Sequence, residues 1–251
     1  MISNVKIVIH IPHASLRMPS IIHKYRVCNR KTLKETAVFM ADLYVDKLIH
    51  DYKTVKFSYS RLFCDVERFR SDKLESMSKK GMGCVYKRDC FGNDITNYPL
   101  EYKNFVLKNY YDKHHKRLDT IVDKILSKFD KCLIIDLHSY SDELVNTIFN
   151  VDSNDYPDIC IGFNENYCDM HIVSFIKECF KKFGYSVKYN YPYQGSIINN
   201  KALKNKDTRV YSIMIEINKR IYLKENEIDV IKFEKLKDSL GQILKDLEEF
   251  L

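Results

Sequence analysis

The sequence predicts an α/β fold in which helices flank a mixed, largely parallel β-sheet. Short apolar runs alternate along the chain with longer segments whose apolar residues recur at helical spacing. Strands that alternate with helices are typical of such sheets, because each helix returns the chain to the next strand. The 251 residues include only seven glycines and five prolines, with no linker-like or repeated stretch. We therefore expect a single domain over residues 1–251.

Four apolar runs are predicted as strands, and four amphipathic segments are predicted as helices. The strands are expected at residues 5–11, 54–63, 132–137 and 212–217, with weaker candidates at 158–162 and 186–190. The helices are expected at residues 31–51, 100–129, 170–183 and 230–251.

Composition limits the classes of partner. Hydrophobic residues make up 45% of the chain and charged residues 30%, a balance ordinary for a globular protein. No apolar run is long enough to cross a bilayer, and the N-terminus resembles a strand rather than a signal peptide, so we expect a cytoplasmic protein without a membrane partner. The net charge is +7, but the lysines are scattered, which favours solvated faces over a nucleic-acid site.

Residues with reactive side chains follow the predicted strands. In α/β sheets, ligands bind beyond the carboxyl ends of the strands. His13 follows the first strand, the segment from Arg61 to Arg68 ends or follows the second, His138 follows the third, and Glu216 lies near the end of the fourth. We expect these side chains to converge at one edge of the sheet.

Two histidines and a carboxylate are candidate metal ligands. His13 and His138 suit zinc, which takes three protein ligands in catalytic sites and leaves a position open for water. For the third ligand we place Asp42 ahead of Asp46. Their i, i+4 spacing puts both on one face of the predicted helix, among apolar neighbours. A carboxylate in such surroundings needs a metal, lysine or arginine partner. Asp136 lies on the same strand face as His138 and can orient its imidazole.

Glu216 is the candidate general base. It ends an apolar strand, where desolvation raises the pKa of a carboxyl group toward the range that suits proton transfer. The alternative is a structural ion pair with Arg220 or another cation.

Arg61 and Arg68 are candidate carboxylate-binding residues, because a forked guanidinium group matches a carboxylate. The alternative is an internal salt-bridge cluster with Asp65 and Glu67, which lie between them in the sequence.

The motifs resemble those of the N-formylglutamate amidohydrolase family over nearly the whole chain. In order they are IPHAS, a D-x-x-x-D pair, SRLFCDVER, YYDKHHKRL, IIDLHSYS, NYPYQGSI and IEINKRIY. DLHS followed by E-I-N-x-x-x-Y is the most specific part. That family is similar in architecture to zinc carboxypeptidases and aspartoacylases, so the resemblance implies a zinc-exopeptidase-like fold with one Zn²⁺ per chain.

The resemblance also implies roles for particular residues. His13 and His138 correspond to the metal histidines, Glu216 to the catalytic glutamate, and Arg61 and Arg68 to arginines that hold a substrate carboxylate or polarise the carbonyl. The remaining predicted site residues are the substrate contacts Ser139, Asn218 and Tyr222, and the supporting carboxylates Asp136, Asp46 and Asp65.

The chain departs from the related patterns at two positions. Carboxypeptidases carry a glutamate three residues after their first histidine, where this chain has Leu16. The carboxylate ligand must therefore come from elsewhere, and Asp42 is the candidate. Where the family usually has D-x-N-R, this chain reads Asp65-Val66-Glu67-Arg68, and Glu67 adds negative charge beside the expected anion site.

The leading hypothesis is zinc-dependent hydrolysis of a small anionic N-acyl amino acid, best represented by N-formyl-L-glutamate. One alternative keeps the chemistry and changes the substrate, to another N-acyl compound or a peptide-like amide. Another is a non-catalytic anion-binding protein on the same fold, although no nucleic-acid-binding motif is present.

Overall fold

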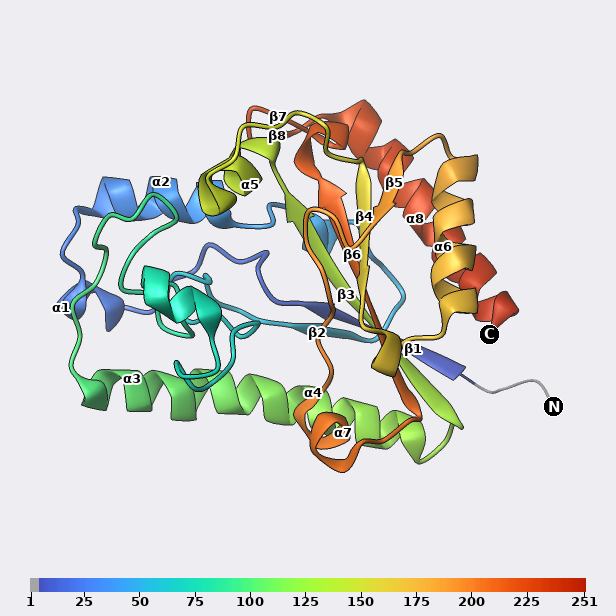
Figure 1. The fold of residues 1–251 in the computed structure, drawn as a ribbon, viewed down its shortest axis with the longest axis horizontal. Coiled ribbons are helices and arrows are strands. Elements are labelled where there is room, and N and C mark those ends of the chain that lie inside the picture. The colour runs from blue at the N-terminus through green and yellow to red at the C-terminus, as the bar shows by residue number, and fades with distance from the viewer. Residues whose placement is uncertain (1–4) are drawn as a thin grey trace.

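The structure, a computed structural model, describes residues 5–251 and is built around a six-stranded sheet with strand order β2-β1-β3-β6-β4-β5 (Figure 1). β1, β2, β3 and β6 are parallel, β4 is antiparallel to β6, and β5 is parallel to β4. The mixed, largely parallel sheet is therefore confirmed. The strands are β1 (Val5–Ile11), β2 (Thr54–Lys56), β3 (Lys131–Tyr140), β4 (Ile159–Phe163), β5 (Val187–Tyr189) and β6 (Val210–Asn218).

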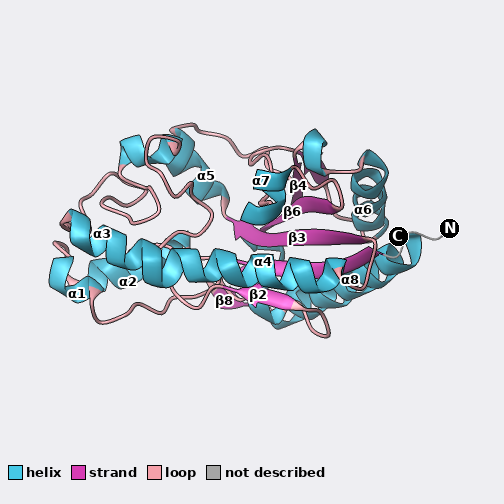
Figure 2. Cartoon of the chain, turned by 90° about the horizontal axis from the view of Figure 1, so that it is seen from below, coloured by secondary structure: helices cyan, strands magenta, loops and turns pink. Residues whose placement is uncertain are grey.

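Helices cover both faces of the sheet. α6 and α8 pack on one face, and α4 and α7 pack on the other (Figures 1 and 2). No helix among residues 5–251 is both long and apolar enough to span a membrane. The helices are α1 (Ile22–Tyr25), α2 (Arg30–Met40), α3 (Leu100–Val106), α4 (Asp112–Leu126), α5 (Asp142–Phe149), α6 (Met170–Lys182), α7 (Asn200–Asn205) and α8 (Val230–Phe250), and a small hairpin is formed by β7 (Leu223–Lys224) and β8 (Glu227–Ile228).

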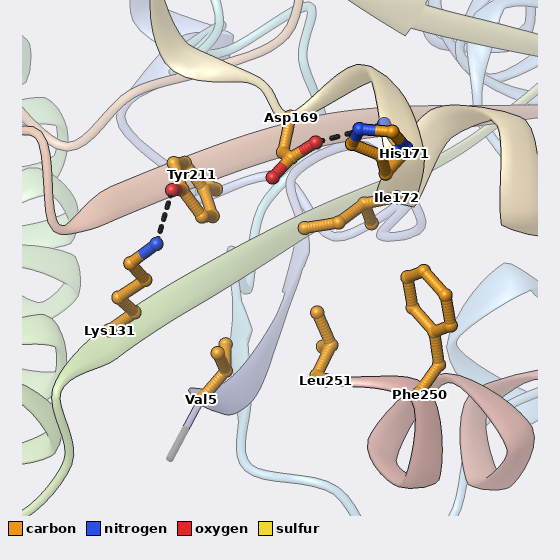
Figure 3. A pocket seen from close by; sticks show the side chains of 8 residues that line it. All are labelled: Val5, Lys131, Asp169, His171, Ile172, Tyr211, Phe250 and Leu251. Atoms are coloured by element: carbon orange, nitrogen blue, oxygen red, sulfur yellow. Dashed lines mark hydrogen bonds between the residues drawn. The ribbon is translucent and has the colours of Figure 1, made fainter. Parts of the chain in front are cut away.

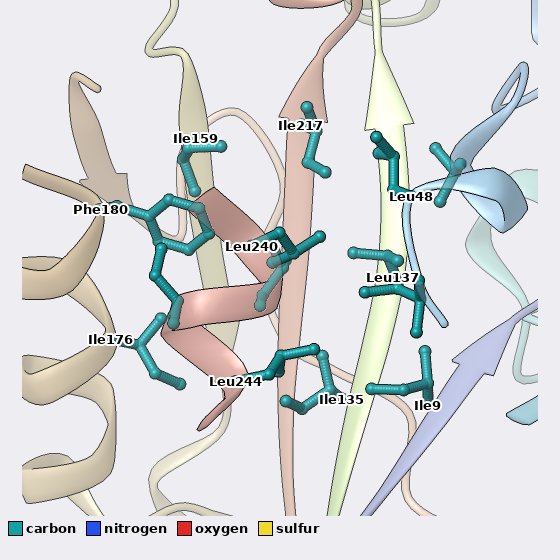
Figure 4. Close-up of a cluster of buried hydrophobic side chains, with 14 of the residues drawn as sticks. Ile9, Leu48, Ile135, Leu137, Ile159, Ile176, Phe180, Ile217, Leu240 and Leu244 are labelled. Atoms are coloured by element: carbon teal, nitrogen blue, oxygen red, sulfur yellow. The ribbon is translucent and has the colours of Figure 1, made fainter. Parts of the chain in front are cut away.

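Packing on both faces of the central strand β3 explains why its sequence is an almost unbroken apolar run. Ile135 and Leu137 lie in the cluster that contains Leu240 of α8 (Figure 4), while Ile134 packs with Leu118 of α4 on the other face. A strand covered on both faces needs apolar residues at successive positions. Apart from Lys131 at its first position, β3 carries polar side chains only toward its carboxyl end, and these form part of the site described below.

A second apolar cluster lies beside the sheet, built from α1, α2, α3, α5 and the long segment between β2 and α3. This cluster explains why the predicted strand 54–63 is wrong beyond Lys56. The Phe57 amide makes one more hydrogen bond to the Ile11 carbonyl of β1, and beyond it Leu62 and Phe63 are buried in the cluster by turns, such as the one closed by the Phe63 amide on the Ser60 carbonyl.

The predicted helix 31–51 is also wrong beyond Met40. The amide of Asp42 donates to the carbonyl of His13 at 3.1 Å, which draws the chain out of the helix, and Tyr44 adopts a left-handed conformation. Asp46 lies in a separate short 3₁₀ turn, so the two aspartates do not share a helical face. The other predicted strands and helices agree with the structure within a few residues, including the joined helices α3 and α4, which a π-helical turn at Leu107–Tyr111 connects.

Candidate active site

The sheet register brings the candidate residues together near the carboxyl ends of the central strands. His10 of β1 is level with Asp136 of β3, and His138 of β3 is level with Glu216 of β6. Asp136 and His138 lie two positions apart and therefore share a strand face, the one that α4 covers.

His13, Asp42 and His138 form a buried group whose ligand atoms all lie within 4.8 Å of one another. The Oδ2 atom of Asp42 is 3.0 Å from Nδ1 of His138 and 3.8 Å from Nδ1 of His13. Nδ1 of His13 is buried and has no hydrogen-bond partner among residues 5–251. A buried polar atom without a partner is costly, and two imidazole nitrogens with one carboxylate oxygen are a donor set that suits Zn²⁺. The residues present therefore fit a metal ion.

The other nitrogen of each histidine faces a carboxylate. Nε2 of His13 is 2.8 Å from Asp65, and Nε2 of His138 is 3.1 Å from Asp136. For His13 this hydrogen bond holds Nε2 in its N–H form and leaves Nδ1 free to bind a metal, whereas Nε2 of His138 lies near Asp136 as an ion-pair partner without a hydrogen bond among residues 5–251. Burial lowers the pKa of His13, whereas for His138 the carboxylate of Asp136 outweighs the effect of burial and raises the pKa.

A second polar group, His10, Glu67 and Asp136, lies directly behind His138. His10 places Nδ1 at 2.8 Å from Asp136 and Nε2 at 2.8 Å from Nε2 of His114 on α4. Glu67 lies 3.5 Å from His10 and 3.6 Å from His138, so its charge faces the histidines. An isolated histidine inside an apolar strand carries no signal of its partners, so the sequence alone does not connect His10 with the site.

Glu216 is buried, at 7% exposure, and its Oε2 atom has no hydrogen-bond partner in the part of the chain that the structure describes. Burial raises its pKa to about 8, although the positive charges of His138 and Arg61 act in the opposite direction. The alternative of an ion pair with Arg220 is wrong: Arg220 pairs instead with Asp142 and Asp158.

Both candidate arginines lie against one carboxylate. Nε and Nη2 of Arg61 are 3.2 and 3.0 Å from Oδ2 of Asp65, and Nε of Arg68 is 3.7 Å from the same oxygen. The pKa of Asp65 stays well below its usual range, because His13 and the arginines outweigh the effect of burial. Asp65 thus links the metal group to the arginines.

The other predicted substrate contacts have partners within the protein. The Tyr222 hydroxyl is 2.8 Å from the Leu43 carbonyl and 2.8 Å from the Ser139 hydroxyl, which ties the ends of β3 and β6 to the loop that carries Asp42. The Asn218 amide donates to Asp142 at 2.6 Å. Their contact with substrate stays a prediction. Asp46, predicted to support the ligands, pairs with Lys56.

Tyr193 was not anticipated. The segment that carries it lies closely against β4, where a Cβ on Gly162 would come within 2.4 Å of the Gly195 carbonyl oxygen. Burial raises the pKa of the Tyr193 hydroxyl, and the charges of Glu216 and Arg61 act on it. Its location beside the site depends on this close packing of two backbones, which the motif NYPYQGSI alone does not reveal.

Lys219 was also missed. It lies one residue beyond β6 and is buried, with Nζ 3.3 Å from the Phe39 carbonyl. A lysine directly after a strand is usually exposed, so the sequence offered no reason to place it inside.

A small pocket lies at the opposite edge of the sheet, near the start of β1, β3 and β6 (Figure 3). Its volume is about 150 Å³, and its lining includes Val5, Lys131 and Tyr211. Lys131 donates to the Tyr211 hydroxyl at 2.6 Å, so these polar groups already have partners.

Comparisons with known proteins point to one family. The sequence profile described as N-formylglutamate amidohydrolase matches residues 5–223. The crystal structure of N-formylglutamate amidohydrolase from Ralstonia eutropha JMP134 is similar, with a TM-score of 0.81, 18% identity, and coverage of 99% of this chain and 94% of that chain. A gene product of Agrobacterium tumefaciens has a TM-score of 0.64 at 18% identity, over 98% and 92% of the two chains. A comparison with curated proteins gave no match.

Proposed function

Since this chain belongs to the N-formylglutamate amidohydrolase family, we propose that it hydrolyses a small N-acyl amino acid, with N-formyl-L-glutamate as the favoured substrate. The observation that carries this proposal is the proximity of a two-histidine, one-aspartate group to a buried glutamate whose pKa is raised to about 8. Such a pairing suits the hydrolysis of an unreactive carbonyl by an activated water.

We assign one Zn²⁺ per chain to His13, Asp42 and His138. A zinc ion held by these residues would lower the pKa of a bound water molecule toward about 7 and would polarise the substrate carbonyl. Asp65 holds the His13 imidazole in the orientation that this binding needs, and the carboxylate of Asp136 lies 3.1 Å from Nε2 of His138.

Glu216, Arg61 and Arg68 lie around this group and supply proton transfer and positive charge. Glu216 accepts a proton from the attacking water as the water oxygen bonds to the formyl carbon. The C–N bond then breaks, and Glu216 returns the proton to the leaving nitrogen, which gives formate and L-glutamate. Arg61 and Arg68 bring positive charge to the site, where it stabilises the carbonyl oxygen or holds a carboxylate of the substrate.

Formate release tests the proposal. The purified, zinc-loaded protein is expected to release formate from N-formyl-L-glutamate with a higher kcat/KM than from N-formyl-L-leucine, because an apolar side chain leaves a buried cation unpaired. The measurement is an enzyme-coupled formate assay, with N-acetyl-L-glutamate included to test the acyl group. Equal rates for both formyl compounds would favour a general deacylase, and no turnover of any compound would contradict the hydrolase assignment.

The role of Asp65 can be tested through metal affinity. Asp65→Asn is expected to weaken zinc binding by about 10- to 100-fold, because the Nε2 atom of His13 loses the carboxylate that orients it. Competition with a chelator of known affinity measures the change. Asp207→Asn is the matched control, since Asp207 pairs with Arg209 outside the site. Unchanged zinc affinity in folded Asp65→Asn would show that Asp65 serves only the arginines.

A further inference from the structure

Lys219 stands out because it is a buried ammonium group without a carboxylate partner. The side chain is 6% exposed, and none of the ion pairs found among residues 5–251 includes it. The polar contact found for Nζ within this part of the chain is the Phe39 carbonyl at 3.3 Å. A buried charge usually has an ion-pair partner, because the attraction of the partner offsets the free-energy cost of removing the charge from water.

Lys219 lies within the candidate site. It follows Glu216 by three residues at the end of β6, and the carbonyl that it reaches belongs to the last turn of α2, three residues before Asp42. Burial lowers its pKa to about 8, and the charges of Asp42, Arg61 and Glu216 all act on it.

Neither nearby carboxylate is available as a permanent partner for Lys219. Asp42 is hydrogen-bonded to His138 and belongs to the metal group, and Glu216 is the proposed base. Arg61, unlike Lys219, already has a carboxylate partner, because two of its nitrogens contact Asp65. Among the described residues of this site, the positive charge that lacks a counter-ion is therefore that of Lys219.

We propose that Lys219 is a substrate-binding residue whose ammonium group pairs with one carboxylate of an N-acylated dicarboxylic amino acid. This inference rests on the proposed function and names a specificity-determining residue for it. The more exposed Arg68 is left for the second carboxylate. A neutral or cationic substrate would leave the Lys219 charge buried and unpaired, so the site selects against it.

The test compares three substrates in wild type, Lys219→Met and Lys219→Arg. The substrates are N-formyl-L-glutamate, N-formyl-L-glutamine and the α-amide of N-formyl-L-glutamate, so that each amide lacks one carboxylate. Lys219→Met is expected to raise KM for N-formyl-L-glutamate roughly 10- to 100-fold, the range for a hydrogen bond to a charged group, with a smaller change in kcat. For the amide that lacks the carboxylate paired with Lys219, the KM of Lys219→Met and the KM of wild type should be nearly equal.

The conservative variant and a surface control complete the design. Lys219→Arg keeps the charge and should recover much of the binding that Lys219→Met loses. Lys232→Met is the matched control, because Lys232 also contacts a carbonyl but is exposed, and its KM should equal that of wild type. An unchanged KM in Lys219→Met, or an equal loss for all three substrates, overturns the proposal.

A binding measurement separates this inference from the proposed function. Calorimetric titration with L-glutamate, L-glutamine and L-isoglutamine reports carboxylate binding even if no formyl compound is hydrolysed. Weaker L-glutamate binding to Lys219→Met, with no loss for one of the two amides, supports the role of Lys219. Equal binding of L-glutamate to wild type and variant, or no binding to either, contradicts it. Lys219→Met should melt no lower than wild type, since it removes a buried charge.

Discussion

Replacement of Glu216 by glutamine is expected to lower kcat by roughly two to four orders of magnitude, the usual contribution of a general acid–base group. The reason is that Glu216 lies buried beside His138, with one carboxylate oxygen unpartnered and a raised pKa. Glutamine keeps the shape of the side chain but cannot accept the proton of the attacking water. Zinc content and KM should change little, as expected for a group that acts in the transition state.

Steady-state kinetics and metal analysis of Glu216→Gln check this expectation. In wild type, kcat/KM should fall as the pH drops through the pKa of Glu216, because the base is then protonated. This pKa is about 8 without metal, and a nearby cation favours the carboxylate and lowers it. The glutamine variant should lose this limb of the profile. Glu178→Gln, at an exposed position, is the control. A folded, zinc-loaded Glu216→Gln with near-normal turnover would show that Glu216 is not the base.

Replacement of His138 by alanine is expected to abolish stoichiometric zinc binding and, with it, hydrolysis. The change removes the nitrogen 3.0 Å from Asp42 and leaves two of the three proposed ligands. Metal analysis after dialysis should give about one zinc per chain in wild type and almost none in the variant. His171→Ala is the matched control, since His171 is exposed and lines the pocket at the opposite edge of the sheet.

Two outcomes would contradict this assignment. Full zinc occupancy in His138→Ala would move the ion away from His13, Asp42 and His138. Two zinc ions per wild-type chain would show that His10, Glu67 and Asp136 also bind a metal, although His10 and Asp136 are already hydrogen-bonded to each other. Circular dichroism of the variant separates loss of a ligand from loss of the fold.

The sequence by itself determined the layered fold and three of the central candidates. Apolar periodicity identified the strands and helices, and the rule that ligands bind at the carboxyl ends of parallel strands directed attention to His13, His138 and Glu216. The fold prediction is confirmed, and the three side chains lie close together in the structure, while their roles stay predictions. The placement follows from local properties, because polar residues begin where the strand stops being covered.

Only the tertiary structure decided how the remaining side chains are paired. Asp42 was selected for a helical face that does not exist; it reaches the site because its amide bonds to the His13 carbonyl as the helix ends. Asp65 is shared by His13 and two arginines, and Lys219 is enclosed without a counter-ion from residues 5–251. Apolar periodicity shows that a residue is buried but not which residues bury it. Ion pairing depends on distances of a few ångströms between segments that lie far apart in the chain, so no local sequence pattern reveals which charged groups pair.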